Sequence, residues 1–354
     1  MSTIEGLSDS APARPSTLEE DICRHPERFR VLTGDRPTGP LHLGHYLGTL
    51  ANRVRLQRAG VEVFLVIADY QVITDRDGVG ELSQTVQGLV LDYVAAGIDP
   101  AAATIFTHSS VPALNQLLVP FLSLVSVAEL QRNPTVKAEA AASRSRGLSA
   151  LLFTYPVHQA ADILFCHGNL VPVGSDQLPH VETTRLIARR FNERYASGAP
   201  IFPQPDALLT AAPVLLGIDG TKMSKSRGNT IALGDDEDRT AALLRRAKTD
   251  SERAITYDPE RRPEVSNLLL IAALCTRRDP AEIADELGGR GAAALKALAT
   301  EAVNEELRPL RQRRRELATD PGYLQQVLAD GNARANEIAD HTLRRVREVM
   351  QMVY

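Results

Sequence analysis

The sequence predicts a doubly wound, Rossmann-like parallel α/β sheet followed by an α-helical domain. Short apolar runs rich in β-branched residues alternate with amphipathic helical patterns over about 200 residues, as in sheets built from strand–helix–strand units. After residue 234 almost every segment is rich in Ala, Leu, Glu and Arg at helical spacing. We therefore expect a flexible tail over residues 1–22, the α/β domain over 23–234 and the helical domain over 235–354.

Each predicted element has a local reason. Strands are expected at four short apolar runs, residues 30–33, 61–68, 104–107 and 170–173. The second run is continuous and β-branched, which is typical of a strand buried on both faces of a parallel sheet. Helices are expected where apolar residues recur every three or four positions, at residues 41–54, 82–96, 114–130 and 149–165. The first residues mix Ser, Ala and Pro, with too few large apolar side chains to offset the entropy of ordering.

Composition excludes several classes of protein. The 354 residues are 44% hydrophobic and 24% charged, which suits a soluble globular chain and excludes a disordered, collagenous or disulfide-stapled one. The net charge of -4 does not support a general nucleic-acid coat. Three cysteines lie far apart without a CxxC pair, so we expect reduced thiols, a cytoplasmic protein and no tightly bound metal site. No signal-peptide pattern or bilayer-length apolar stretch is seen, so we expect no membrane partner.

The most informative stretch is PTGPLHLGH, residues 37–45, which follows the first predicted strand and opens a helix. Backbone N–H groups at a helix start favour anions, and His42 and His45 lie on one face of the first turn. Gly44 removes a side chain between them, so that a nucleotide ring could pack directly on the backbone. Both imidazoles could then donate hydrogen bonds to phosphate oxygens as charge develops. Taken alone, the pattern is explained equally well by two surface histidines near a helix cap.

A second stretch, GTKMSKSRGN at residues 220–229, carries two lysines three positions apart. Ammonium groups on a mobile loop can close on a triphosphate and follow the leaving pyrophosphate. Such a loop alone is more often a solvated basic turn, but its pairing with HLGH is specific. Together, HLGH and KMSKS resemble the two signature motifs of class I aminoacyl-tRNA synthetases, with Leu43 in place of the usual isoleucine. The resemblance implies that the α/β sheet is a catalytic domain of the HUP type.

Two further stretches indicate the amino acid. TYPVHQAADIL at residues 154–164 and VPVGSDQLPHVETTR at residues 171–185 resemble bacterial-type tryptophanyl-tRNA synthetases, and the likeness covers nearly everything after residue 29. The resemblance implies that the chain activates L-tryptophan with ATP, releasing pyrophosphate, and transfers tryptophan from the adenylate to tRNA(Trp). It also implies Mg²⁺ bound with ATP, a homodimer, and a helical domain that binds the anticodon.

The resemblance further implies the residues of the site. Catalytic contacts to the phosphates are assigned to His42, His45, Lys222 and Lys225. The implied ATP-binding residues are Asp35, Arg36, Thr38, Gly39, Gly44, His45, Asp176, Lys222, Met223, Ser224, Lys225 and Ser226. The implied tryptophan-binding residues are Leu32, Thr33, Gln71, Tyr155, Gln159, Asp162, Val173 and Gln177. No residue is assigned to a metal.

Asp162 is the residue on which the choice of tryptophan depends. An indole has one polar atom, an N–H donor, on a large apolar body, so its pocket needs one buried acceptor inside apolar walls. The resemblance makes Asp162 that acceptor and Leu32 and Val173 the walls, with Gln177 and Tyr155 on the α-ammonium group. An isolated Asp on a helix would more often be a surface carboxylate paired with a cation.

Some positions depart from the bacterial pattern. His158 and Gln159 stand where that family usually has apolar residues, and Tyr70-Gln71 replaces the more usual Gln-His pair. A polar Gln159 could add a hydrogen bond to Asp162 or to the substrate, or it could only orient Asp162. These changes put the detailed contacts of the pocket in question and leave tryptophan as the best substrate.

Two basic stretches have an open interpretation. In relatives, several lysines near the ATP phosphates follow residue 132; here the candidates are Lys137, Arg144 and Arg146, unless the stretch is a surface loop without a phosphate role. In the helical domain a basic cluster could contact tRNA phosphates or form a solvated helix face, and it consists of Arg308, Arg311, Arg313, Arg314 and Arg315. The predicted helix 114–130 is a candidate for the dimer interface, or it is core.

Three other functions fit part of the sequence. A small-molecule nucleotidyltransferase shares HxGH and the sheet, but it explains neither the helical half nor the AADIL run. A tyrosyl-tRNA synthetase is the nearer alternative, although these enzymes usually lack AADIL and carry a different lysine loop. A family member kept only as a binding or regulatory partner is disfavoured by the intact HLGH and KMSKS motifs.

Overall fold

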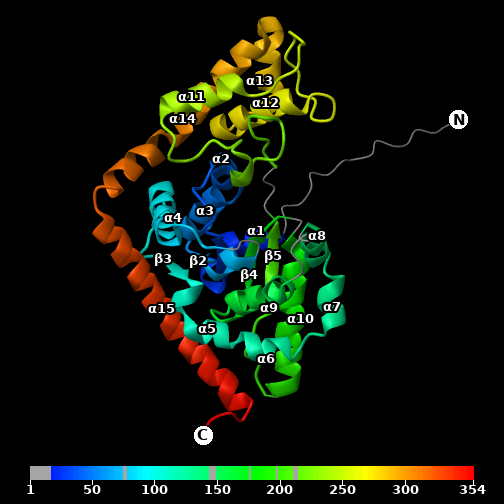
Figure 1. Cartoon of the computed structure of the whole chain (residues 1–354), viewed down its shortest axis with the longest axis vertical. Helices are drawn as coiled ribbons and strands as arrows, with labels where there is room; N and C mark the ends of the chain where they lie inside the picture. Colours follow the sequence, from blue (N-terminus) through cyan, green and yellow to red (C-terminus); the bar gives the residue numbers. More distant parts are fainter. Residues whose placement is uncertain (1–16, 75–77, 143–148, 175–176, 197, 210–213) are drawn as a thin grey trace, which may run out of the picture.

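The computed structural model describes residues 17–74, 78–142, 149–174, 177–196, 198–209 and 214–354. Figure 1 shows the arrangement of its helices and strands. The expectation of a flexible tail is wrong over residues 17–22, because Thr17–Arg24 form helix α1. Leu18 and Ile22, one helical turn apart, pack on the core, and Ile22 is fully buried. Residues 1–16 lie outside the described part of the chain.

The described residues form one sheet of five parallel strands in the order β3-β2-β1-β4-β5. The strands are β1 (Arg30–Asp35), β2 (Glu62–Ile67), β3 (Ala103–Thr107), β4 (Leu170–Val173) and β5 (Asp206–Leu209). The order changes direction between β1 and β4, and doubly wound sheets bind ligands outside the carboxyl ends of their strands at this point. The predicted fold class is confirmed. The prediction lacked β5, because this short edge strand is partly exposed and has no continuous apolar run.

Helices cover both faces of the sheet. Successive strand residues point to opposite sides, so each face carries apolar side chains that pack against helices. Val63 and Leu65 of β2 belong to one hydrophobic core, whereas Phe64 and Val66 belong to a second. The first core includes residues of α3 (Ala51–Arg58) and α4 (Leu82–Ala96), and the second includes residues of α9 (Ala150–Leu164) and α10 (Leu178–Tyr195). Each fully buried side chain of this size contributes about 1.5–3 kcal/mol. Burial on both sides explains the continuous apolar run of β2.

Some elements end where sequence signals indicate and others are interrupted. Helix α4 ends at Gly97, whose φ of 110° is left-handed and therefore suits glycine. Residues 41–54 begin with two short turns, α2 (Leu43–His45) and the π-helical η2 (Tyr46–Leu50), before α3. The expected single helix 114–130 is wrong, because the chain forms three short helices there, α5 (Pro112–Gln116), α6 (Leu118–Leu122) and α7 (Val127–Arg132).

A capping box explains why α7 begins anew. The hydroxyl of Ser126 accepts a hydrogen bond from the Glu129 N–H at 3.2 Å, and the Glu129 carboxylate accepts one from the Ser126 N–H at 2.8 Å. Leu114, Phe121 and Leu130 are all buried although they lie on different helices. The apolar spacing over residues 114–130 therefore indicates which residues are buried, but it does not show that they belong to one continuous helix. Helix α8 (Pro134–Ala142) follows.

The C-terminal part is helical, as expected. It contains α11 (Glu237–Arg246), α12 (Pro263–Thr276), α13 (Pro280–Leu287), α14 (Gly291–Leu317) and α15 (Pro321–Val349). Five short 3-10 turns complete the described structure: η1 (Pro26–Arg28), η3 (Tyr70–Thr74), η4 (His108–Ser110), η6 (Lys225–Arg227) and η7 (Gly288–Arg290). No described helix is both long enough and apolar enough to cross a bilayer.

Helix α15 returns to the α/β part of the molecule and covers the edge strand β3 (Figure 1). A Cβ on Gly331 of α15 would lie 1.9 Å from the backbone oxygen of Ile105, so the two backbones touch. The Asn332 side-chain oxygen accepts a hydrogen bond from the Thr107 N–H at 3.0 Å. The unpaired edge of β3 is thus covered by a helix. The division of the chain at residue 235 stays a prediction, and α15 packs with the domain that precedes that boundary.

Candidate active site

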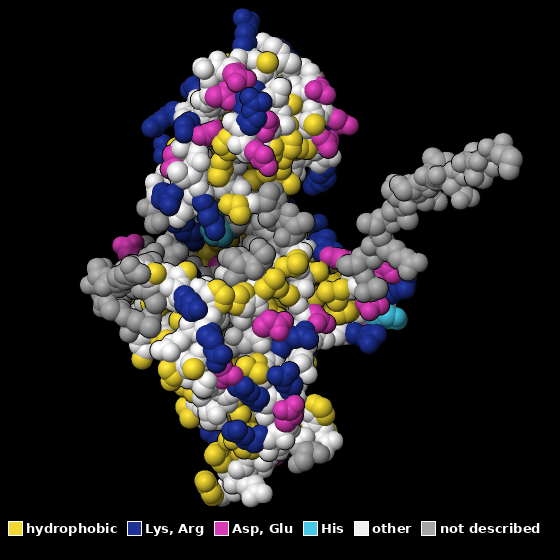
Figure 2. Space-filling model, turned by 90° about the vertical axis from the view of Figure 1, so that its right-hand side faces the viewer, with side chains coloured by type: hydrophobic (Ala, Val, Ile, Leu, Met, Phe, Trp, Pro, Cys, Tyr) yellow, Lys and Arg dark blue, Asp and Glu magenta, His cyan; other side chains and the backbone are white. Residues whose placement is uncertain are grey.

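A cavity of about 660 Å³ lies at the carboxyl ends of β1, β2 and β4, where the strand order changes direction. In Figure 2 the surface is hollowed between the helical part and the α/β part, with Lys or Arg side chains at the edge. Most of the implied site residues line the cavity: Leu32, Thr33, Asp35, Arg36, His42, Gly44, His45, Gln71, Tyr155, Gln159, Asp162, Val173, Gln177, Lys222 and Met223. Four implied residues, Thr38, Gly39, Ser224 and Lys225, are described but are not among its lining residues. Asp176 and the side chain of Ser226 lie outside the described part.

The two motifs meet although they are far apart in the sequence. Lys225 Nζ donates a hydrogen bond to the Gly39 backbone oxygen at 2.7 Å, across 186 positions. The Leu43 N–H donates to the Ile231 oxygen at 2.9 Å, and the segment after KMSKS thereby runs beside the first motif. A Cβ on Gly44 would lie 3.5 Å from the Met223 sulfur, an ordinary van der Waals contact, so the two motifs pack against each other here. The expected convergence is therefore observed.

Asn229 holds the KMSKS loop in shape. Its side-chain oxygen accepts a hydrogen bond from the Ser224 N–H at 2.8 Å. Its amide nitrogen donates to Asp219 at 2.8 Å, and Asn229 is buried. The buried amide thus ties both ends of the loop, which places Lys222 at the cavity and Lys225 at the first motif.

The two histidines of the first motif are neutral at neutral pH. Burial, reinforced by His45 and Lys225, lowers the pKa of His42 to about 3. Burial also lowers the pKa of His45 to about 4, against the attraction of Asp35. His45 Nδ1 accepts a hydrogen bond from the His42 N–H at 3.3 Å, so the neutral ring carries its proton on Nε2. His45 is therefore a neutral N–H donor and not a cation.

Asp35 at the end of β1 is held by a buried network. Arg53 NH1 donates to Asp35 Oδ2 at 2.5 Å, and the Tyr93 hydroxyl donates to the same oxygen at 2.7 Å. Burial would raise the pKa of Asp35, but the Arg53 guanidinium outweighs it and holds that pKa well below its ordinary value. Arg53 also donates to the Gly34 oxygen, so it fixes the strand end beside the histidines. Sequence reasoning missed Arg53 and Tyr93, which lie on interior faces of ordinary helical patterns.

The other end of the cavity is built mainly by α9. Tyr155, Gln159 and Asp162 recur at intervals of four and three residues, so they share one helix face. Leu32 in the middle of β1 and Val173 at the end of the adjacent strand β4 are buried apolar residues that line the same cavity. The Tyr155 hydroxyl is 3.0 Å from His180 Nε2. Asp162 is only 4% exposed, so the surface-carboxylate alternative is wrong.

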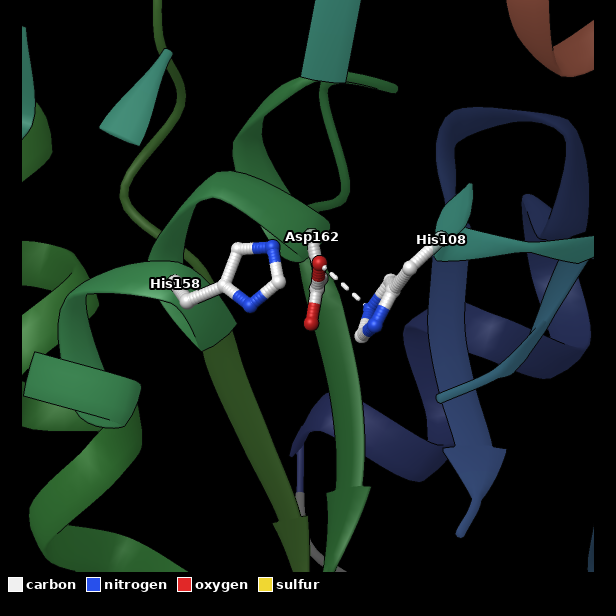
Figure 3. A group of neighbouring side chains, drawn as sticks. All are labelled: His108, His158 and Asp162. Carbon is white, nitrogen blue, oxygen red and sulfur yellow. Dashed lines mark ion pairs between the residues drawn. The ribbon is translucent and has the colours of Figure 1, made fainter. Parts of the chain in front are cut away.

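The imidazole of His108 lies against Asp162, and Figure 3 shows the contact. Its Nε2 lies 2.9 Å from Asp162 Oδ1, and His108 is fully buried. Burial lowers the pKa of His108, but the Asp162 carboxylate outweighs it, with a smaller contribution from Asp69, and the net pKa is raised. The rings of His158 and Tyr70 face His108 at centroid distances of 4.6 and 6.4 Å. Sequence reasoning missed His108, although its place directly after β3 put it at the functional edge of the sheet.

The basic stretches have mixed outcomes. Lys137 is exposed on α8, while Arg144 and Arg146 lie outside the described residues. Three arginines of the C-terminal cluster hydrogen-bond within the protein; the solvated-face interpretation is wrong for Arg311, which is buried, while Arg313 is exposed and Arg314 half-buried, and tRNA contact stays a prediction. Arg311 is buried and donates to Thr240 at 2.6 Å, Arg313 donates to the Ala95 oxygen at 2.7 Å, and Arg314 donates to buried Asp92 at 2.8 Å. Arg308 pairs with Glu305 on the exposed face of α14.

Comparison with known proteins agrees with this geometry. Residues 24–308 match the family model of class I tRNA synthetases (W and Y). The chain is 43% identical over 329 residues to the tryptophan–tRNA ligase of Treponema pallidum (strain Nichols), covering 91% of this chain and 96% of that protein. It is 39% identical over 336 residues to the tryptophan–tRNA ligase of Clostridium longisporum, covering 92% of this chain and 97% of that protein. The tryptophanyl-tRNA synthetase of Campylobacter jejuni complexed with ADP and tryptophan superposes with a TM-score of 0.76 at 32% identity, covering 91% of this chain and 100% of that chain. The chain therefore belongs to the class I tRNA synthetases and, within them, to the tryptophan–tRNA ligase family.

Proposed function

We propose that this cavity activates L-tryptophan with ATP and Mg²⁺ and passes it from the adenylate to tRNA(Trp). One observation carries the proposal: Asp162, the HLGH histidines and Lys222 line a single cavity. A buried acceptor among apolar side chains suits an indole, and the N–H donors and ammonium groups suit phosphates. Tryptophan would therefore lie at the Asp162 end of the cavity, and the ATP phosphates at the end with the HLGH histidines and Lys222.

The tryptophan end of the cavity is defined by α9. The indole N–H would donate to Asp162, while Leu32 and Val173 pack on the ring. Gln177 and Tyr155 also line this cavity, and their polar atoms would hold the α-ammonium group. A site built around one N–H donor discriminates strongly against analogues without it, because the buried acceptor would then lose its partner.

The ATP end supplies placement and charge neutralisation. A carboxylate oxygen of tryptophan attacks the α-phosphorus, the new P–O bond forms, and the bond to pyrophosphate breaks. His45 Nε2–H and His42 would donate hydrogen bonds to phosphate oxygens. Lys222 and Lys225 would follow the departing pyrophosphate, with Mg²⁺ held by the phosphates.

The second step needs no covalent enzyme intermediate. The terminal ribose hydroxyl of tRNA attacks the carbonyl carbon of the adenylate, AMP leaves, and the hydroxyl proton is lost to the departing phosphate or to water. Ser224 belongs to the loop that carries the lysines and is not a nucleophile in this scheme.

The proposal includes a cytoplasmic homodimer whose helical part binds the anticodon. Exposed apolar residues in the segment predicted to form the interface, Val119 and Val127, support the dimer. Light scattering on the purified chain should give twice the 38.5 kDa of one chain. A monomer at micromolar concentration would contradict this part of the proposal.

ATP–pyrophosphate exchange tests the activation step. We expect exchange that depends on tryptophan, is much slower with tyrosine, and is absent without an amino acid. Faster exchange with tyrosine, or exchange without amino acid, would overturn the assignment. Charging of tRNA(Trp) by the same preparation then tests the transfer step and separates a translation enzyme from an adenylate-forming binder.

A further inference from the structure

We propose that His108 is a positioning residue that sets tryptophan specificity: it holds one oxygen of Asp162 so that the other is presented to the indole N–H. The inference rests on the proposed function and deepens it. His108 follows β3, whereas Asp162 lies on α9, and the two side chains meet in the interior. His108 is fully buried and Asp162 is 4% exposed.

The contact pairs the imidazole with one of the two carboxylate oxygens. His108 Nε2 is 2.9 Å from Asp162 Oδ1. In Figure 3 the dashed contact reaches one oxygen of Asp162, and the second oxygen points away from it. A carboxylate without this contact could rotate about its terminal bond, because that torsion is broad. An acceptor held in place before the substrate arrives needs no reorganisation when it binds.

Asn115 braces His108 from the other side. Its amide nitrogen donates to the backbone oxygens of His108 and Val111 at 2.8 and 3.0 Å. Two carbonyl partners fix which end of the amide is the nitrogen. Its oxygen therefore faces His158 Nε2 at 2.8 Å, and this ring nitrogen must carry a proton.

The same network argues against a metal ion at this place. One ligand atom each from His108, His158 and Asp162 lies within 4.8 Å of the others, as in a three-ligand metal site. However, His158 Nε2 donates to Asn115, and His158 Nδ1 faces the amide nitrogen of Gln71 at 3.4 Å. Both ring nitrogens of His158 thus have hydrogen-bond partners, so a metal would have to break one of these contacts. We therefore assign the cluster to orienting Asp162.

Selectivity between tryptophan and β-(3-benzothienyl)alanine measures this role directly. The analogue has nearly the shape of tryptophan but carries sulfur in place of the indole N–H. The readout is the ratio of kcat/KM values for the two amino acids in ATP–pyrophosphate exchange with the full chain. We expect His108→Leu to raise the KM for tryptophan and to lower this ratio, each by about 10-fold or more, and to leave the KM for ATP unchanged.

Rescue separates positioning from mere support of the fold. His108→Gln keeps an N–H donor of similar reach, so its selectivity should stay within about 3-fold of the unaltered protein. His167→Asn removes another partly buried imidazole, which hydrogen-bonds to the Ile201 oxygen away from the cavity, and should not alter selectivity. Asparagine tolerates the left-handed φ of 56° at this position. If His108→Leu does not fold, His108→Asn is too short to reach Asp162 and makes the same prediction.

Three outcomes would overturn the inference. Unchanged selectivity in His108→Leu would show that His108 does not position Asp162. The same would follow if His108→Gln lost as much selectivity as His108→Leu. About one equivalent of Zn²⁺ in the purified chain, lost in His108→Leu and in His158→Leu, would replace positioning by metal binding. Asp162→Leu distinguishes this failure from that of the proposed function. If Asp162→Leu keeps its selectivity, the indole placement itself is wrong; if it loses selectivity while His108→Leu keeps it, only the present inference fails.

Discussion

Replacement of Lys225 by alanine should slow adenylate formation strongly and leave tryptophan binding almost unchanged. Lys225 Nζ lies 2.7 Å from the Gly39 oxygen, so the ammonium group reaches the first motif. Loss of a charge-assisted hydrogen bond costs about 1.5–3 kcal/mol, and loss of one preorganised donor to a developing charge costs about 2.7–4 kcal/mol. The second value converts to a rate decrease of about 10²–10³-fold. Lys225 is not among the residues that line the cavity around Asp162, so the KM for tryptophan should change by less than about 2-fold.

Exchange kinetics with saturating ATP and varied tryptophan measure both parameters. Lys296→Ala is a matched control, because Lys296 Nζ also donates to a backbone oxygen, that of Arg245 at 3.2 Å, but in the helical part. Its exchange rate should equal that of the unaltered chain. A Lys225→Ala rate within about 3-fold of normal, or an equal loss in Lys296→Ala, would refute the reasoning.

Three further predictions concern stability. Arg53→Met leaves the buried Asp35 carboxylate without its cation, so the free energy of unfolding in urea should fall by about 3–5 kcal/mol; a loss below 1 kcal/mol would contradict it. Gly331→Ala forces α15 away from β3, and thermal unfolding should show a loss of about 1–3 kcal/mol rather than the gain expected for alanine in a helix. The raised pKa of His108 stabilises the fold below pH 6.5, and this stability is lost as pH rises through the raised value. Unfolding at about pH 6 and pH 9 should therefore show a larger deficit of His108→Gln at the lower pH, and equal deficits would count against the Asp162 ion pair.

Much of the fold was readable from local patterns. The run at residues 61–68 predicts β2 because a strand covered on both faces is apolar at every position, whichever helices cover it. Gly97 ends α4 because its positive φ is costly for other residues. HLGH and KMSKS were likewise readable, because phosphate chemistry requires particular residues at short spacing; His42, His45 and Lys222 do line one cavity, and Lys225 reaches Gly39 beside it.

Contacts between distant segments were not readable in this way. Apolar spacing over residues 114–130 reports burial, but it does not reveal whether one helix or three provide it. The local sequence around an arginine does not show whether the side chain is solvated or buried. Arg311 is buried and donates a hydrogen bond to Thr240 of another helix. His108 becomes significant only because α9 brings Asp162 within 2.9 Å of it. Periodicity along a chain records which side of an element is covered, whereas the identity of the covering group depends on packing between segments that are remote in sequence.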